Sequence, residues 1–158
     1  EMERLGMLVD VSHLSETSFW AVDQVSERPY IASHSNAKAL ASNRRNLTDK
    51  QIEALAKKGG VIGVVFCPPF IADDTQNVSL SAVCDHIDHI KKVAGIDHVG
   101  LGTDFDGYGV RPGAPQVMKD VSEMPKLTEA LSDRGYTEEE IKKVLGGNWL
   151  RVYGEVIG

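Results

Sequence analysis

The sequence has no excess of basic residues. Its 158 residues include 17 Lys and Arg against 23 Asp and Glu, which gives a formal net charge of −6. Proteins that bind nucleic acids neutralise phosphates with clustered Lys and Arg, and no basic stripe is present here. We therefore exclude general nucleic-acid binding. The Arg44–Arg45 pair is local and does not change this conclusion.

Cysteines and long apolar runs are also scarce. Cys67 and Cys84 are the two cysteines, and they form neither a disulfide framework nor a zinc-ligand spacing. We interpret both as reduced, partly buried thiols. No apolar run approaches the roughly 18 residues that a membrane-spanning helix needs, and no signal peptide is visible. The lack of disulfide-rich character favours a cytoplasmic protein.

What is present is an alternation of apolar runs and helical patterns. The composition, 42% hydrophobic and 25% charged, is that of a globular domain. Two capping boxes, Thr48 with Gln51 and Thr137 with Glu140, mark helix starts. The predicted strands are 5–12, 30–33, 61–66 and 98–103, and the predicted helices are 15–25, 49–58, 79–94, 121–133 and 137–156.

This order is four βα units followed by a C-terminal helix. Alternating strands and helices imply a parallel sheet with helices outside it. The strand lengths and repeat spacing suit a (β/α)8 TIM-type barrel, but only half of one. An open four-stranded sheet would leave two edges unpaired, and the chain begins with Glu1, not Met. We therefore expect residues 1–158 to be the C-terminal half of a barrel whose N-terminal half is absent from this chain.

Three of the four predicted strands end in groups that can bind metals or protons: His13, His34 and Asp104. Parallel α/β folds bind ligands beyond the carboxyl ends of their strands. Neutral imidazole binds zinc, and a neighbouring carboxylate can bind a second metal or a proton. The alternatives are core histidines satisfied by hydrogen bonds and, for Asp104, a turn residue, a role that suits Asp106 better.

Other polar residues also have both a functional and a structural interpretation. Arg44 and Arg45 follow the second histidine, and a guanidinium there could bind a carboxylate; for Arg44 we favour a solvated loop charge. The cluster 85–89 lies in mid-helix on the exterior and favours a packing or solvated role over metal binding. His98 precedes its strand and is interpreted as structural. The loop 108–116 is long enough to form part of a site rim. No GxSxG, Walker or GxGxxG motif is present, so metal-assisted hydrolysis is the best reaction class.

Five co-linear motifs together carry a family resemblance. The chain resembles the C-terminal half of the membrane (renal) dipeptidase family of zinc dipeptidases, and the resemblance extends over essentially its whole length. The motifs are Asp10-Val11-Ser12-His13, Ser33-His34-Ser35, Asn43-Arg44-Arg45-Asn46, Gly102-Thr103-Asp104-Phe105-Asp106-Gly107 and Gly147-Asn148-Trp149-Leu150-Arg151-Val152.

The resemblance implies a (β/α)8 barrel with two zinc ions per complete site, whose shared hydroxide hydrolyses dipeptides. His13 and His34 match two ligands of one zinc. Arg45 matches the arginine that binds the substrate's C-terminal carboxylate, and Asp104 matches the aspartate that orients the water and shuttles its proton. Asn148 matches a motif residue that we assign to substrate binding near the site mouth. The parent protein is expected to be a homodimer.

The family's His-x-Asp ligand motif, bridging glutamate and oxyanion-stabilising histidine all lie upstream of the segment that this chain matches. The chain therefore supplies half of one binuclear site, and we expect the isolated 158 residues to be inactive. Two alternatives remain open. One is a catalytically inactive barrel that only binds its ligand, and the other is a metal-dependent amidohydrolase that acts on non-peptide amides.

Overall fold

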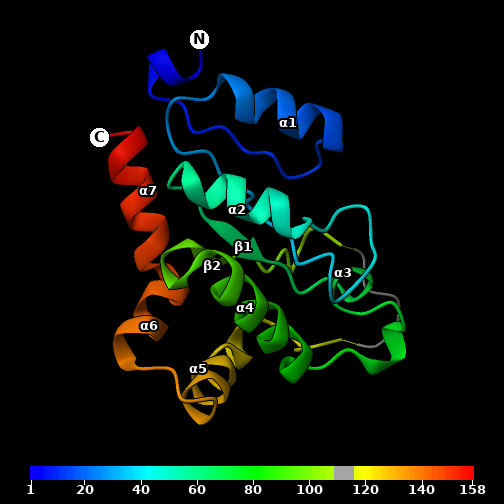
Figure 1. Ribbon diagram of the computed structural model, residues 1–158. Helices are drawn as coiled ribbons and strands as arrows, with labels where there is room; N and C mark the ends of the chain where they lie inside the picture. The colour runs from blue at the N-terminus through cyan, green and yellow to red at the C-terminus, as the bar shows by residue number, and fades with distance from the viewer. Residues whose placement is uncertain (109–115) are drawn as a thin grey trace.

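The computed structural model describes residues 1–108 and 116–158, which form a mixed α/β fold (Figure 1). The expected rim loop 108–116 lies, except for its two ends, outside the described residues. The helices and strands are α1 (Glu16–Val25), α2 (Asp49–Lys57), β1 (Ile62–Val64), α3 (Pro68–Ile71), α4 (Leu80–Ala94), β2 (Val99–Leu101), α5 (Pro125–Asp133), α6 (Glu138–Lys142) and α7 (Asn148–Val156). Short 3-10 helices cover Glu3–Leu5, Thr75–Asn77, Ile96–His98 and Val121–Glu123.

Four parallel chain segments lie side by side in sequence order. β1 pairs with β2, with Ile62 opposite Val99. Isolated parallel bridges then join Ala32 to Ile62 and Asp10 to Ile31. Because all pairs are parallel, the carboxyl ends of the four segments meet at one edge. This arrangement brings the predicted strand-end side chains to the same side of the fold.

The predicted strands 5–12 and 30–33 are not regular strands in the structure. Each contributes isolated bridges only, and Glu3–Leu5 is a 3-10 helix that ends at Gly6 in the left-handed conformation. The carboxylate of Asp10 accepts hydrogen bonds from the backbone N–H groups of Ser12 and Ser33, at 3.0 Å each. These two N–H groups are thereby taken up by a side chain in place of a strand partner, which interrupts the ladder.

Most of the predicted helix starts are confirmed. The Ser15 side chain caps α1, and Ser79, one of the two serines considered for the role, caps α4. The capping boxes Thr48–Gln51 and Thr137–Glu140 are both complete. In each box the threonine hydroxyl accepts the backbone N–H of the third helical residue, whose side chain accepts the threonine backbone N–H. The sequence rules for helix N-termini therefore hold for these helices.

The predicted helix 137–156 is interrupted. A π-helical turn over Lys143–Gly147 separates α6 from α7, and Gly146 departs from helical geometry with ψ −19° and φ 171°. Glycines and π turns are common causes of such breaks, and glycine weakens a helix because it loses the most backbone freedom there. The break lets α7 turn back along the strands.

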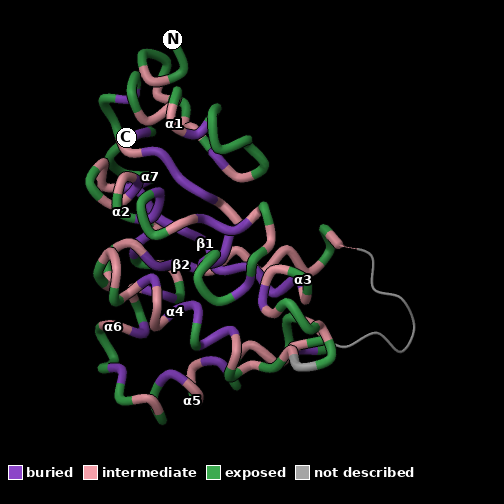
Figure 2. Tube along the Cα trace, turned by 45° about the vertical axis from the view of Figure 1, so that its right-hand side comes forward, coloured by how far each residue is buried: buried purple, intermediate pink, exposed green. Residues whose placement is uncertain are grey.

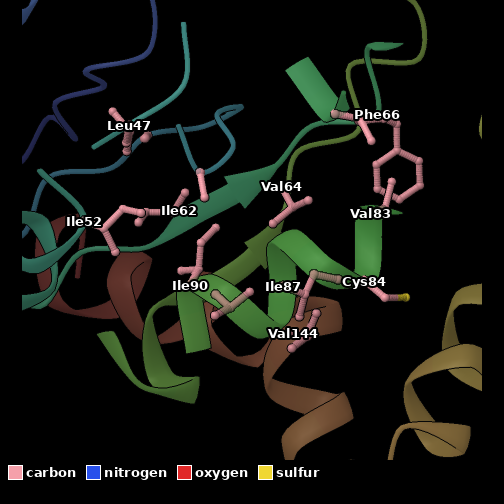
Figure 3. Packing of buried hydrophobic residues seen from close by; sticks show 14 of the residues in the cluster. Leu47, Ile52, Ile62, Val64, Phe66, Val83, Cys84, Ile87, Ile90 and Val144 are labelled. Atoms are coloured by element: carbon pink, nitrogen blue, oxygen red, sulfur yellow. The ribbon is translucent and has the colours of Figure 1, made fainter. Parts of the chain in front are cut away.

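The main core lies between the strands and the helices. α4 packs against β1 and β2, and Figure 3 shows Ile87 and Ile90 of α4 near Ile62 and Val64 of β1. All four are fully buried. Figure 2 shows that β1 and the first two residues of β2 are buried, whereas most of α1 is exposed.

A second, smaller core lies around α7. Val152 and Val156 of α7 are buried with Ile31 and Val61. The indole of Trp149 donates a hydrogen bond to the Leu101 carbonyl at 3.1 Å. Helix α7 therefore packs against the second, third and fourth of the parallel segments. In the described ranges, no helix is long and apolar enough to cross a membrane.

Candidate metal and carboxylate site

His13 and His34 meet at the carboxyl edge of the parallel segments. Their Nε2 atoms are 2.9 Å apart, although the residues are 21 positions apart in the chain. His13 adopts the left-handed backbone conformation with φ 74°, which turns its side chain out of the strand direction. Strained residues of this kind cluster at functional sites. The expected convergence of the two histidines is therefore a feature of the structure.

A hydrogen-bond network orients the His34 ring. Its Nδ1 lies 2.8 Å from the Ser33 hydroxyl, and that hydroxyl donates to Oδ2 of Asp10 at 2.6 Å. The His34 backbone N–H donates to the Ser12 hydroxyl at 3.0 Å. These contacts join the two histidine-bearing segments and fix the ring of His34 between them. Ligating histidines commonly have such outer partners.

The geometry of the two Nε2 atoms fits a single metal ion. Zinc–nitrogen bonds measure about 2.0–2.1 Å, so two nitrogens on one tetrahedral zinc ion lie roughly 3.3 Å apart. The 2.9 Å observed here would widen slightly when both atoms bind the ion. Partial burial lowers the pKa of His13, and the positive charge of Arg45 lowers it further. A neutral imidazole is the form that binds metals. The pair thus supplies two ligands.

Arg45 lies beside the histidine pair with unused donors. Its Nε and Nη2 atoms are buried and have no partner among the described residues. The guanidinium lies over the Phe70 ring, with Cζ 5.3 Å from the ring centroid. Burial lowers the pKa of Arg45, and the charge of Asp104 offsets part of that effect. A buried arginine fork without a partner is suited to bind a carboxylate.

The loop that holds Arg45 is shaped by asparagines. The Arg45 N–H donates to Oδ1 of Asn43 at 2.9 Å, as in an Asx turn. Asn46 donates to the carbonyls of Ala41 and Phe70, both at 2.9 Å. These bonds fix Arg45 and the Phe70 ring relative to each other. By contrast Arg44 is exposed, which agrees with the solvated role expected for it.

Asp104 follows β2 and has the second positive φ among the described non-glycine residues, 58°. Its carbonyl accepts the Gly107 N–H at 2.9 Å, which closes the turn 104–107. The Asp104 carboxylate packs against Gly107, and a Cβ added to Gly107 would overlap Oδ1 of Asp104. The exposed Asp106 lies within the turn, as predicted. Asp104 raises the pKa values of His13 and Arg45, although other causes dominate both.

Two hollows open at this edge. One, of about 720 Å³, is lined by residues that include His13, Arg45 and Phe70. The other, of about 620 Å³, is lined by residues that include Asp104 and Tyr108. Volumes of this size accommodate small ligands. Both cysteines are free and buried, and burial raises the pKa of Cys67 to about 11, so its thiol stays protonated.

Asn148 does not join these residues. It is buried, and its amide donates to the carbonyls of Ile96 and Val99, both at 2.7 Å. Val99 begins β2, so Asn148 lies at the opposite end of that strand from Asp104. Its contacts give it a structural role, joining α7 to the start of β2, and they do not support the expected role in substrate binding.

The remaining histidines have structural partners. His86 is fully buried; its Nδ1 accepts the Ala37 N–H at 3.2 Å and its Nε2 lies 2.9 Å from the Ile71 carbonyl. His89 pairs with Asp49 at 2.8 Å, and His98 lies 2.7 Å from the Gly60 carbonyl. Packing and surface roles are thus confirmed for the helical pair, and a structural role for His98.

Within the described residues, no group of three or more His, Cys, Asp and Glu side chains could hold a metal ion. The histidine pair would need further ligands to complete a metal site.

The fold is mixed α/β, and its site combines a histidine pair suited to a metal with an arginine suited to a carboxylate. The chain belongs to the membrane dipeptidase family, peptidase family M19, whose model matches residues 1–157. This family of metallopeptidases implies a metal cofactor.

Individual relatives agree with this assignment. The chain is 40% identical to an uncharacterized protein in the pqqA 5' region of Klebsiella pneumoniae, covering 99% of this chain and 57% of that protein. It is 39% identical to dipeptidase tcpJ of Claviceps purpurea, covering 99% and 36%. A metallo peptidase from Rhodobacter sphaeroides, solved with a phosphinate mimic of the dipeptide L-Ala-D-Ala, aligns with a TM-score of 0.90 and 35% identity, covering 98% and 44%. The chain thus spans about a third to slightly over half of the length of these relatives.

Three residues of the site, Asp10, Ser12 and Ser33, were not predicted to be functional. The signal available in the sequence was the serine before each histidine and the aspartate three residues before His13. Their role depends on which residues of two segments lie opposite each other, and that register is visible only in the structure.

Proposed function

We propose that the chain is the C-terminal half of a (β/α)8-barrel zinc dipeptidase. The observation that carries this proposal is the shared hollow of His13 and Arg45, where a metal-ligand pair lies beside an unpaired guanidinium. Support for the half-barrel comes from the four parallel segments in sequence order and from the share of the relatives' length that the chain spans. An N-terminal half would supply the remaining metal ligands and cover the open edges.

In this proposal His13 and His34 hold one of two zinc ions. Bound zinc supplies a Lewis acid and lowers the pKa of water. Arg45 binds the substrate's C-terminal carboxylate through its guanidinium, in which Nε and Nη2 are left without a protein partner. Phe70 holds the plane of the guanidinium. The scissile bond of a dipeptide lies one residue from its carboxylate, so this clamp directs hydrolysis to the peptide bond next to a free C-terminal residue.

Asp104 is the proton carrier of the proposal. Its carboxylate is fixed by the turn 104–107 and lies near enough to His13 and Arg45 to affect both of their pKa values. It accepts the proton of the attacking water and returns it to the leaving amine. The whole protein is proposed to be a homodimer, a point that rests on the family resemblance.

The substrate class is tested with a dipeptide and its C-terminal amide. The full-length protein that carries this chain, loaded with zinc, should hydrolyse L-Ala-D-Ala, the dipeptide mimicked in the Rhodobacter sphaeroides structure. The amide should be hydrolysed more than tenfold more slowly, because an unpaired buried charge costs about 2–5 kcal/mol. Equal kcat/KM values for the two compounds would exclude the carboxylate clamp.

Three further measurements separate the alternatives. The isolated 158-residue chain with added zinc should show no hydrolysis, and measurable activity would overturn the half-site proposal. Binding of zinc and dipeptide by the full-length protein without turnover would instead indicate an inactive binding protein. Faster hydrolysis of acylated amines or lactams than of dipeptides would indicate a different amidohydrolase.

A further inference from the structure

Asp10, Ser33 and His34 form a chain of hydrogen bonds whose proton positions can be deduced. The Asp10 carboxylate accepts from the Ser12 and Ser33 backbone N–H groups through Oδ1, at 3.0 Å each. Its other oxygen, Oδ2, lies 2.6 Å from the Ser33 hydroxyl. An ionised carboxylate only accepts hydrogen bonds. The single proton of the Ser33 hydroxyl is therefore directed at Asp10.

The next contact follows from the first. Because the Ser33 proton points to Asp10, the Ser33 oxygen is an acceptor toward Nδ1 of His34, 2.8 Å away. The proton in that contact must belong to His34, so Nδ1 is protonated. A neutral imidazole carries one ring proton, and Nε2 of His34 is therefore left with a free lone pair.

That lone pair faces the partner histidine. Nε2 of His34 lies 2.9 Å from Nε2 of His13. Two lone pairs at this distance would repel each other, so in the metal-free chain Nε2 of His13 donates to Nε2 of His34. The described residues record no hydrogen bond to Nδ1 of His13 that would fix its tautomer. The two histidines are thus unequal, because one is held in its metal-binding tautomer and the other is not.

We propose that Asp10 and Ser33 are positioning residues that hold His34 as the Nδ1–H tautomer, with Nε2 ready to bind the metal. The metal itself rests on the proposed function, whereas the tautomer can be observed without it. Outer partners of this kind typically contribute 10–100-fold to metal affinity. We call the hydrogen-bonded chain Asp10–Ser33–His34 the relay. The bonds from the Ser12 and Ser33 backbone N–H groups to Asp10 make the relay part of the pairing between the two segments.

The decisive variant is Asp10→Asn, which is nearly isosteric. Its Oδ1 can still accept the two backbone N–H groups, but an amide NH₂ then replaces Oδ2 and donates to the Ser33 hydroxyl. The Ser33 proton must turn to Nδ1 of His34, which forces the Nε2–H tautomer. The Asp→Asn change in serine-protease triads acts through the same reversal of tautomer. Ser33→Ala should release the ring without reversing it.

The test is ¹⁵N NMR of the imidazole nitrogens, whose chemical shifts identify the protonated atom. It is carried out above pH 8 on the metal-free full-length protein that carries this chain. Wild type and Ser33→Thr, which keeps the hydroxyl, should show Nδ1–H at His34. Asp10→Asn should show Nε2–H, and Ser33→Ala a mixture. Ser35→Ala is the matched control. Among the described residues the Ser35 side chain has one recorded hydrogen bond, to the Ser12 hydroxyl at 3.4 Å, so its loss should leave the His34 tautomer unchanged.

Zinc affinity, measured by competition with a chelator, is the second readout. It should fall 10–100-fold in Ser33→Ala, fall at least as far in Asp10→Asn, and stay within threefold of wild type in Ser33→Thr. Nε2–H at His34 in wild type, or an unchanged tautomer in Asp10→Asn, overturns the relay. If the tautomers behave as expected but wild type binds no zinc, the relay stands and the proposed metal function fails.

Discussion

Replacing Arg45 by methionine should stabilise the fold while removing the substrate clamp. The guanidinium leaves Nε and Nη2 buried without partners, and an unsatisfied buried donor costs about 1–3 kcal/mol. The opposing term is the cation–π contact with Phe70, worth roughly 0.5–1 kcal/mol. Methionine keeps an apolar stem over the ring. Because Arg45 is only half-buried, we expect a net gain of about 1–2 kcal/mol in the free energy of unfolding.

Equilibrium urea unfolding measures this gain. With a urea m-value of about 1–3 kcal/mol/M, the midpoint should rise by roughly 0.3–2 M. Arg44→Met is the matched control, because Arg44 is an exposed neighbour and its loss should change stability by less than about 0.5 kcal/mol. If the full-length protein is the proposed dipeptidase, Arg45→Met in it should raise KM for a dipeptide more than tenfold. A destabilised Arg45→Met variant, or equal shifts in the two variants, would refute the reasoning.

Three further predictions concern the frame around the site. Gly102→Ala should lower the free energy of unfolding by about 1–3 kcal/mol or more, because a Cβ there would overlap the Ser33 carbonyl. Gly154→Ala, in an open helical position, should instead raise it by about 0.5–1 kcal/mol. Thermal unfolding of the two variants measures the difference. Asn148→Ala should lower the free energy of unfolding by about 2–4 kcal/mol, because it leaves two carbonyls unpaired. In full-length protein that is still folded, KM should be unchanged, and a raised KM would place Asn148 at the site. Thr137→Ala should cost about 1 kcal/mol through loss of its capping box, and a urea midpoint equal to that of wild type would contradict this.

Local sequence signals predicted much of the fold. The serine and threonine caps identified four helix starts, since a cap depends only on residues three apart. The apolar run 61–66 predicted β1, although its regular part is limited to Ile62–Val64. The parallel order followed from the alternation of elements, and with it the meeting of His13 and His34 at one edge.

What the sequence could not predict depends on contacts across the chain. The bonds of Asp10 to Ser33 require a register between segments 23 residues apart. Near-continuous apolar runs lack the alternation of apolar and polar residues that would specify this register. The sequence motif predicts Asn148 at the site mouth, but its amide contacts the first residue of β2, at the other end of that strand. Which end it reaches depends on the helix break at Lys143–Gly147. The unpaired state of Arg45 is likewise a tertiary property.

The central claim is that His13 and His34 hold one metal ion on which activity depends. The most direct measurement is zinc content and dipeptide hydrolysis of His34→Ala in the full-length protein, with His89→Ala, an exterior helix histidine paired with Asp49, as the control. We predict that His34→Ala loses bound zinc and activity together, while His89→Ala retains both. A His34→Ala protein that keeps its zinc and its turnover would contradict the claim.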